Sequence, residues 1–274
     1  VTLLAQLEED DVDAKVLAGG QSLVPMLNLR VARPEALVDL RKLNELVYIR
    51  DEGDMIAIGA MTAKSAAEDS SLIREKQPLF QRASHLIGHR QIRNRGTVGG
   101  SFAHNDPAAE YGAVAMVLDL EFKILGADGE RVVPADEFYV TFFTTDIDST
   151  ELLTEVRVPV MAAGTGWAIQ EMARRDGDLA IAGVAVTVRL DQGKCVDTRI
   201  AVFGVNGCPL RLSSAESLVN GQAPSESLFE QAGQAGSAEL QDPIVVVHGS
   251  AEYRRQLVSV LTARCLAEAA ERAS

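Results

Sequence analysis

Segments with the helical spacing of apolar residues and segments with the spacing of strands follow one another along the chain, and they predict its secondary structure. Helical spacing of apolar residues predicts helices at 2–10, 23–30 and 78–92, after Thr62, and at 251–273. Apolar runs or alternation predict strands at 12–20, 35–41, 48–62, 121–135 and 167–205. Residues 111–120 fit a helix or another buried segment. The pattern therefore predicts a mixture of helices and strands over the whole chain.

Capping and turn residues place the ends of these elements. Thr62 and Ser250 are candidate N-caps, and Pro78 suits the first position of a helix. Hairpin turns are expected at 127–129 and 191–193, and a glycine-rich loop at 96–110. In the last helix, one face is expected to carry Tyr253, Leu257, Val260, Leu261, Cys265 and Leu266.

Composition and charge narrow the class of protein. The chain has 274 residues, of which 47% are hydrophobic, so a well-buried core and two domains are expected. No apolar run reaches the roughly 20 residues of a membrane span, and no signal-peptide pattern opens the sequence, so a cytoplasmic location is expected. A net charge of −13 disfavours broad binding to nucleic acid or to anionic membranes.

The familiar catalytic and metal motifs do not occur. Three cysteines without a CxxC pair predict buried apolar thiols, not a disulfide framework or a metal site. The four histidines, His85, His89, His104 and His248, show no ligand spacing apart from an i, i+4 pair without a third ligand. GxGxxG, the P-loop, GxSxG and HExxH are all missing. No residue is therefore predicted to be catalytic or to bind a metal.

Two glycine segments carry the chemistry that the sequence does show. The first is KVLAGGQSL, at 15–23, in which a predicted strand runs into Gly19 and Gly20 just before a predicted helix. The second is GTVGGS, at 96–101. A lone Gly-Gly pair is commonly only a turn, but glycines also let successive backbone N–H groups converge on an anion, and a following helix adds its free N–H groups. Together the segments predict a pyrophosphate held from two sides.

Arg90, Arg93 and Arg95 form a basic island in an acidic sequence. One interpretation is a cationic last helical turn that ends with Gly96 at C′ and complements the helix dipole. The alternative is a contact to an anionic ligand or to a partner subunit.

Five sequence blocks together resemble one known family. They are LAGGQSLVPMLNLRVARPEALVDL, IGAMT, QIRNRGTVGGSFAHNDPAAE, ELLTEVRVP and SAEYRRQLVSVLTAR. In this order and spacing they resemble the FAD-binding medium subunits of the molybdenum hydroxylase and xanthine dehydrogenase family, such as the medium subunit of carbon monoxide dehydrogenase. The likeness covers nearly the whole chain.

The resemblance implies an α+β fold with two domains. Residues 1–162 would form an FAD-binding domain of two subdomains, of the PCMH type found in vanillyl-alcohol oxidase, and residues 163–274 a smaller domain of antiparallel sheet and helices. No catalytic or metal-binding residue is implied. The implied FAD contacts are Leu17, Ala18, Gly19, Gly20, Gln21, Ser22, Leu86, Ile87, Thr97, Val98, Gly99, Gly100, Ser101, Ala103, His104, Asp106, Glu110, Leu153, Asp178 and Leu179.

Three of these positions depart from the family pattern. Ser101 stands where many relatives have asparagine, and its hydroxyl offers fewer hydrogen-bonding groups. Glu110 replaces an aspartate that bonds the adenosine ribose, which keeps the carboxylate but lengthens its reach. Leu179 replaces a tyrosine near the flavin ring.

The resemblance also implies a function and partners. The chain would be an electron-transfer subunit that takes electrons from the [2Fe–2S] clusters of a small subunit onto FAD and passes them to an external acceptor. A large subunit would hold the molybdenum cofactor, and the complex would be a dimer of heterotrimers. The alternatives are a stand-alone flavin reductase or oxidase and a non-redox structural subunit that binds a nucleotide. The organic substrate and the terminal acceptor cannot be derived from this chain.

Overall fold

The computed structural model describes residues 1–247 and 249–274, so the histidine at 248 lies outside the described residues. The chain divides into two compact units, each built from separate stretches of sequence. The first unit comprises Val1–Glu75, His89–Asn105 and Asp119–Val160, and the second comprises Lys76–Gly88, Asp106–Leu118 and Met161–Ser274. None of the described helices combines the length and apolar character needed to cross a membrane.

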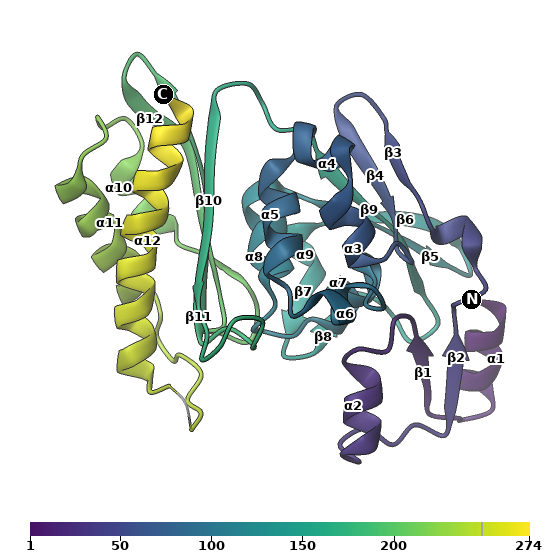
Figure 1. The fold of residues 1–274 in the computed structure, drawn as a ribbon. Coiled ribbons are helices and arrows are strands. Elements are labelled where there is room, and N and C mark those ends of the chain that lie inside the picture. Colours follow the sequence, from purple (N-terminus) through teal and green to yellow (C-terminus); the bar gives the residue numbers. More distant parts are fainter. Residues whose placement is uncertain (248) are drawn as a thin grey trace. The chain divides into compact units, whose positions relative to one another are not determined.

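The N-terminal part of the first unit is a small parallel two-stranded layer. Its elements are α1 (Thr2–Glu9), β1 (Ala14–Leu17), α2 (Leu23–Asn28) and β2 (Ala36–Asp39). Strands β1 and β2 run parallel, with Leu17 opposite Asp39 (Figure 1). Leu4 and Leu40 pack with Leu152 in a small apolar cluster. The sequence prediction of these two helices and two strands is confirmed.

A five-stranded antiparallel sheet forms the larger part of the first unit. Its order is β3 (Ile49–Asp51), β4 (Met55–Gly59), β9 (Leu152–Pro159), β5 (Glu121–Gly126) and β6 (Gly129–Pro134). Phe122 lies at the centre of its aromatic core, with ring centroids 3.9 Å from Phe138 and 5.0 Å from Phe102. The predicted turn at 127–129 is confirmed, and Gly129 adopts a φ of +117° there.

The remaining elements of the first unit are short. They are η1 (Asn44–Leu46), α3 (Lys64–Asp69), α4 (Ser71–Lys76, which runs into the second unit), α6 (Arg90–Arg93), α7 (Val98–His104), α9 (Ala135–Phe138), β7 (Tyr139–Thr141) and β8 (Thr144–Thr145). The prediction of Thr62 as an N-cap is wrong, because α3 begins after Ala63. The Thr62 hydroxyl instead donates to the Tyr48 carbonyl at 2.9 Å and accepts the Tyr48 N–H at 3.1 Å.

A four-stranded antiparallel sheet and three C-terminal helices dominate the second unit. The sheet order is β10 (Thr165–Met172), β11 (Ala182–Asp191), β12 (Lys194–Phe203) and β13 (Leu210–Arg211), and the helices are α10 (Ser213–Val219), α11 (Glu226–Ala238) and α12 (Ala251–Ala273). Helix α12 lies along β10 and β11 (Figure 1). The predicted hairpin is confirmed, since Gln192 and Gly193 both have positive φ, as a type I′ turn requires.

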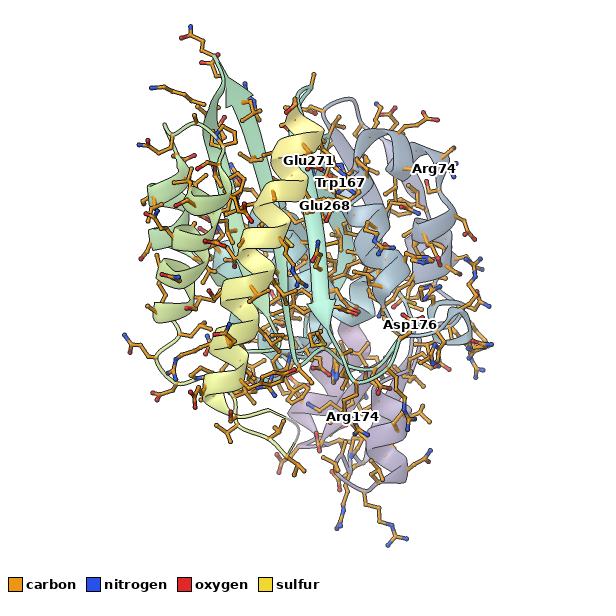
Figure 2. All side chains as sticks on the ribbon, turned by 60° about the vertical axis from the view of Figure 1, so that its left-hand side comes forward. Arg74, Trp167, Arg174, Asp176, Glu268 and Glu271 are labelled. Carbon is orange, nitrogen blue, oxygen red and sulfur yellow. The ribbon has the colours of Figure 1, made fainter. Side chains whose placement is uncertain are left out.

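Helix α12 begins as the sequence predicts. The Ser250 hydroxyl accepts the Tyr253 N–H at 3.1 Å, which satisfies one free donor of the first turn. The buried face differs from the prediction at one end, because Tyr253 is 42% exposed and Arg254 is buried in its place. Farther along the helix, Figure 2 shows Glu268 near Trp167, and the Glu268 carboxylate accepts the Gln170 side-chain amide at 2.8 Å.

Two further helices complete the second unit, α5 (Pro78–Leu86) and α8 (Glu110–Leu118). The Phe80 and Tyr111 rings stack with centroids 4.8 Å apart, and the Ser84 and Tyr111 hydroxyls lie 2.7 Å apart. The single predicted helix at 78–92 is wrong in its extent. It ends at Leu86, and Gly88 has a φ of +51°, which breaks the helix before α6.

Candidate functional site

The first glycine segment joins β1 to α2 and presents unused backbone donors. Gly20 has a φ of +73°, which a residue with a side chain adopts only at a cost. Among the described residues, the backbone N–H groups at 18–23 donate to no other group of the chain. A turn with left-handed geometry and free N–H groups beside a helix start is an arrangement that binds phosphate oxygens.

The second glycine segment is a helix start and not the loop that the sequence predicts. Thr97 is the N-cap of α7, and its hydroxyl accepts the Gly100 N–H at 3.1 Å. The N–H groups of Val98 and Gly99 donate to the carbonyls of Thr62 and Ala60 at 2.8 and 2.9 Å. The amides at 98–100 are therefore used inside the protein, and Ser101 at the end of the segment is partly exposed.

The two glycine segments lie directly against each other within the first unit. A Cβ added to Gly19 would stand 2.1 Å from the Arg95 carbonyl oxygen, so only glycine permits this approach. A Cβ on Gly100 would lie 3.3 Å from the Ala18 Cβ. The bare backbone at Gly19 thus serves contact between the segments, while the free amides of the first segment remain for a ligand. This arrangement fits the diphosphate of a dinucleotide.

The other predicted contacts of the first unit vary in exposure. Leu153 is 6% exposed in β9, where it lies opposite Ile124, so its side chain is part of the sheet core. Ala103 is exposed on α7. The His104 ring lies 5.1 Å from the Phe143 ring.

The remaining predicted contacts belong to the second unit. Asp106 accepts the Ala108 N–H at 2.9 Å, and Glu110 is buried at the start of α8. Leu179 is 69% exposed in the loop after β10, which also carries Asp178. The others are Leu86, which is partly exposed, and Ile87, which is buried.

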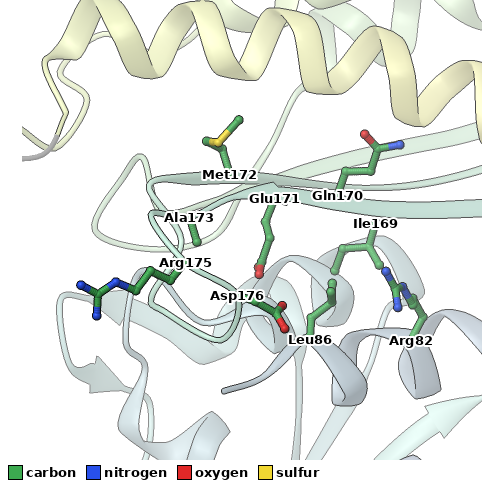
Figure 3. A pocket seen from close by; sticks show the side chains of 9 residues that line it. All are labelled: Arg82, Leu86, Ile169, Gln170, Glu171, Met172, Ala173, Arg175 and Asp176. Carbon is green, nitrogen blue, oxygen red and sulfur yellow. The ribbon is translucent and has the colours of Figure 1, made fainter. Parts of the chain in front are cut away.

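A hollow in the second unit adds a group that the sequence reading missed. It has a volume of about 360 Å³ and lies between α5 and the end of β10 (Figure 3). It is lined by Arg82, Leu86, Ile169, Gln170, Glu171, Met172, Ala173, Arg175 and Asp176.

Glu171 is the unusual group of this hollow. One of its carboxylate oxygens is buried and has no hydrogen-bond partner. Burial raises the pKa of Glu171 to about 8, and Glu110 and Asp176 add to the shift while Arg82 opposes it. The sequence does not single out Glu171, because the alternation of apolar and polar residues marks it only as a residue of a strand.

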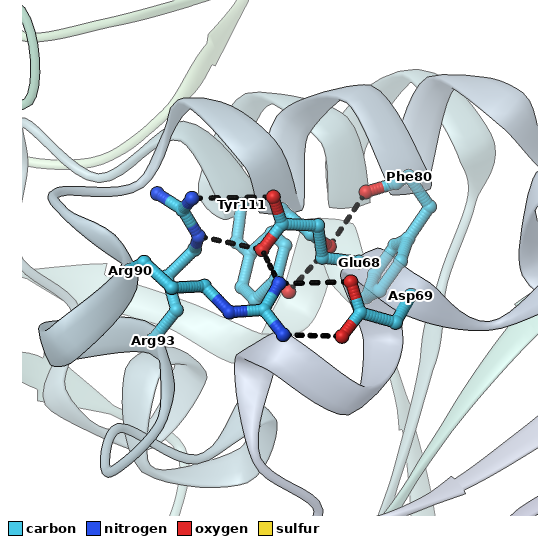
Figure 4. Close-up of polar contacts among 7 residues, drawn as sticks. Glu68, Asp69, Phe80, Arg90, Arg93 and Tyr111 are labelled. Carbon is cyan, nitrogen blue, oxygen red and sulfur yellow. Dashed lines mark hydrogen bonds and ion pairs between the residues drawn. The ribbon is translucent and has the colours of Figure 1, made fainter.

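The basic island is held by acidic residues of α3. The Arg93 Nε lies 2.7 Å from Glu68, and both side chains are almost fully buried (Figure 4). Arg90 pairs with Glu68 at 3.0 Å and also with Asp69. Gly96 does not have the positive φ expected at C′, and Asn94 is the C-cap. Arg90 and Arg93 are therefore held in ion pairs within the first unit, and Arg95, which is exposed like Arg90, takes no part in these pairs.

Comparison with known families matches almost all of the chain. Residues 1–161 match the FAD binding domain in molybdopterin dehydrogenase. Residues 167–269 match the CO dehydrogenase flavoprotein C-terminal domain.

Individual relatives agree with these matches. The chain is 42% identical to the 6-hydroxypseudooxynicotine dehydrogenase complex subunit alpha of Paenarthrobacter nicotinovorans, covering 98% of this chain and 91% of the relative. It is 38% identical to the carbon monoxide dehydrogenase medium chain of Hydrogenophaga pseudoflava, covering 97% and 91%. A solved structure of the Hydrogenophaga pseudoflava carbon monoxide dehydrogenase matches with a TM-score of 0.95 at 38% identity over 99% of this chain and 93% of that one. The chain therefore belongs to the FAD-binding oxidoreductase subunits of the molybdopterin dehydrogenase family and has the two-domain fold of the carbon monoxide dehydrogenase medium chain.

Proposed function

We propose that this chain is the electron-transfer subunit of a molybdenum hydroxylase complex. It receives electrons from [2Fe–2S] clusters of a small subunit and passes them to an external acceptor, while a large subunit holds the molybdenum cofactor. The two dehydrogenase-subunit relatives named above support this assignment. So does the first glycine segment, whose free amides suit a diphosphate. We further propose a dimer of such heterotrimers in the cytoplasm.

In this proposal the chain's own residues bind and orient the cofactor. The amides at 18–23 hold the diphosphate, and Gly19 keeps them against the second segment through its contact with Arg95. The other predicted contacts, from Leu86 to Leu179, are proposed to border the rest of FAD. FAD itself supplies the redox chemistry, and the protein supplies its binding and electrostatic surroundings.

We also propose the finer fold assignment that the resemblance implies. Residues 1–162 would be a PCMH-type, vanillyl-alcohol-oxidase-like FAD domain of two subdomains, and residues 163–274 the C-terminal domain. The two family matches, to 1–161 and 167–269, support a boundary in this region.

Two glycine variants test the diphosphate site. Gly20 and Gly53 have φ values of +73° and +89°, so alanine strains both backbones, at about 1–2 kcal/mol each. Only Gly20 lies in the proposed site. Loss of one or two charge-assisted hydrogen bonds predicts at least about tenfold weaker FAD binding for Gly20→Ala. The Gly53→Ala control should bind FAD like the unmodified chain, and equal affinities for both variants would refute the assignment.

An anaerobic mixing experiment tests electron transfer. The FAD-loaded chain is mixed with its chemically reduced [2Fe–2S] subunit, and flavin absorbance is followed. Bleaching by this donor is expected. If an organic substrate alone bleaches the flavin and the reduced subunit does not, the chain is a stand-alone reductase or oxidase. If the folded chain retains no FAD, the non-redox alternative is correct.

A further inference from the structure

Arg254 is an arginine buried without a carboxylate partner. It lies in the first turn of α12 and is 4% exposed. Its Nη1 donates to the carbonyls of Ile181 and Gly204, and its Nε is buried with no hydrogen-bond partner. No described Asp or Glu forms an ion pair with it. Burial lowers its pKa, and a cation in the first turn also opposes the helix dipole. This position is therefore costly for stability.

The two carbonyls that Arg254 binds belong to two different chain segments. The Ile181 N–H donates to the Met172 carbonyl at 2.7 Å, which closes the base of the loop at 173–180. The Gly204 N–H donates to the Pro107 carbonyl at 2.7 Å, which holds the segment that leads into α8. One guanidinium therefore ties the base of the 173–180 loop to the 106–109 segment, and both ties lie within the second unit.

Both segments carry proposed FAD contacts. Asp178 and Leu179 lie in the loop at 173–180. Asp106 is the first residue of the segment at 106–109, and Glu110 follows it directly. We propose that Arg254 is a positioning residue for FAD, which fixes these two segments relative to each other through the Ile181 and Gly204 carbonyls. The proposal rests on the FAD contacts proposed above. It explains why a charged side chain is kept where an apolar one would pack at less cost.

The neighbouring Arg255 supplies a matched control. It also donates to two backbone carbonyls, those of Leu240 at 2.9 Å and Gln241 at 2.5 Å. The segment that it holds carries no proposed FAD contact. Replacing either arginine by methionine removes two hydrogen bonds to carbonyls, but only the change at 254 releases the proposed cofactor segments.

The experiment uses the full chain and measures three quantities. These are the affinity for FAD by fluorescence titration, the visible circular dichroism of bound FAD, and the rate at which trypsin cuts after Arg174 or Arg175 in the apoprotein. Figure 2 shows Arg174 in the loop after β10. For Arg254→Met we expect at least about tenfold weaker FAD binding, altered flavin dichroism and several-fold faster cleavage, with substantial recovery in Arg254→Lys. For Arg255→Met, FAD affinity and cleavage should stay at the level of the unmodified chain.

A second variant tests the same junction if Arg254→Met does not fold. Gly204 has a φ of +77°, and a Cβ there would lie 3.0 Å from the Ala180 and Ile181 carbonyl oxygens, so Gly204→Ala disturbs the junction from its other side. The proposal predicts the same loss of FAD affinity and faster cleavage. It is overturned if the 254 and 204 variants bind FAD and resist trypsin like Arg255→Met. If even the unmodified chain binds no FAD, the proposed function fails, and cleavage of the apoprotein still decides whether Arg254 ties the loop.

Discussion

Glu171 should make the stability of the second unit fall as the pH rises. Its pKa is raised in the folded protein from an ordinary value of 4.5 to about 8. Between these pH values the folded state holds a proton that the unfolded state has released, so the free energy of unfolding decreases as the pH rises through this window. At about 1.4 kcal/mol per pKa unit the shift corresponds to an upper bound of about 5 kcal/mol. Since Glu171 keeps partial contact with solvent, we expect about 2–3 kcal/mol of this to be measured.

The Glu171→Gln variant isolates this contribution. Glutamine keeps the volume and polarity of the side chain but does not titrate, so the difference in unfolding free energy between variant and unmodified chain should shift by about 2–3 kcal/mol in favour of the variant between pH 5 and pH 9. Urea unfolding can be followed by the fluorescence of Trp167, the single tryptophan of the chain, which lies in β10 of the same unit. Asp191→Asn, at an exposed turn of that unit, is the control. Parallel pH profiles for Glu171→Gln and the unmodified chain would refute the reasoning.

Three further predictions concern an ion pair, a glycine and the cysteines, each within one of the two units. Arg93→Met leaves the buried Glu68 carboxylate with a weaker set of partners and should cost about 3–5 kcal/mol in urea unfolding, and Glu68→Gln in the same chain should recover part of this. Gly99→Ala places a Cβ 2.4 Å from the Ala60 Cβ. This change should lower the free energy of unfolding by about 1–3 kcal/mol, measured by circular dichroism during urea unfolding. With a thiol reagent, the partly exposed Cys208 should react first in the native chain, whereas Cys265, whose pKa is raised by burial, should react only on unfolding; equal rates would contradict this.

The ends of helices and strands could be predicted from the sequence where they depend on residues only a few positions away in the chain. Ser250 caps α12 because the bond from the Tyr253 N–H to its hydroxyl spans only three residues. The turn at 191–193 follows from Gly193, which accepts the positive φ required there, although Gln192 also takes a positive φ that its side chain disfavours. The order and spacing of several motifs carried a family resemblance that no single motif would have carried. The two glycine segments do lie against each other, and their shared role in holding a cofactor stays a prediction.

Signals that depend on distant residues could not be read from the sequence. Thr62 has the side chain of a helix cap, but its hydroxyl is used by the Tyr48 backbone of a neighbouring segment. The two glycines of α7 suggested a loop, because glycine lowers helix propensity by about 1 kcal/mol. The close approach of Ala60, which requires Gly99 there, is a tertiary contact. In the same way, Glu171 and Arg254 look like ordinary strand and helix residues until their burial is known.

The glycines of the first segment show why a bare backbone does not identify a ligand contact by itself. Gly19 has to be glycine because the Arg95 carbonyl occupies the space of its Cβ, and this holds whether or not a ligand is bound. Gly20 differs, because its left-handed φ orients the chain while only the side chains of Val24 and Leu17 lie near a Cβ there, at 3.1 and 3.2 Å. Loss of FAD after a change at Gly19 would therefore report the collapse of the contact between the segments. The same loss after a change at Gly20, beside a normal Gly53 control, would report the diphosphate site.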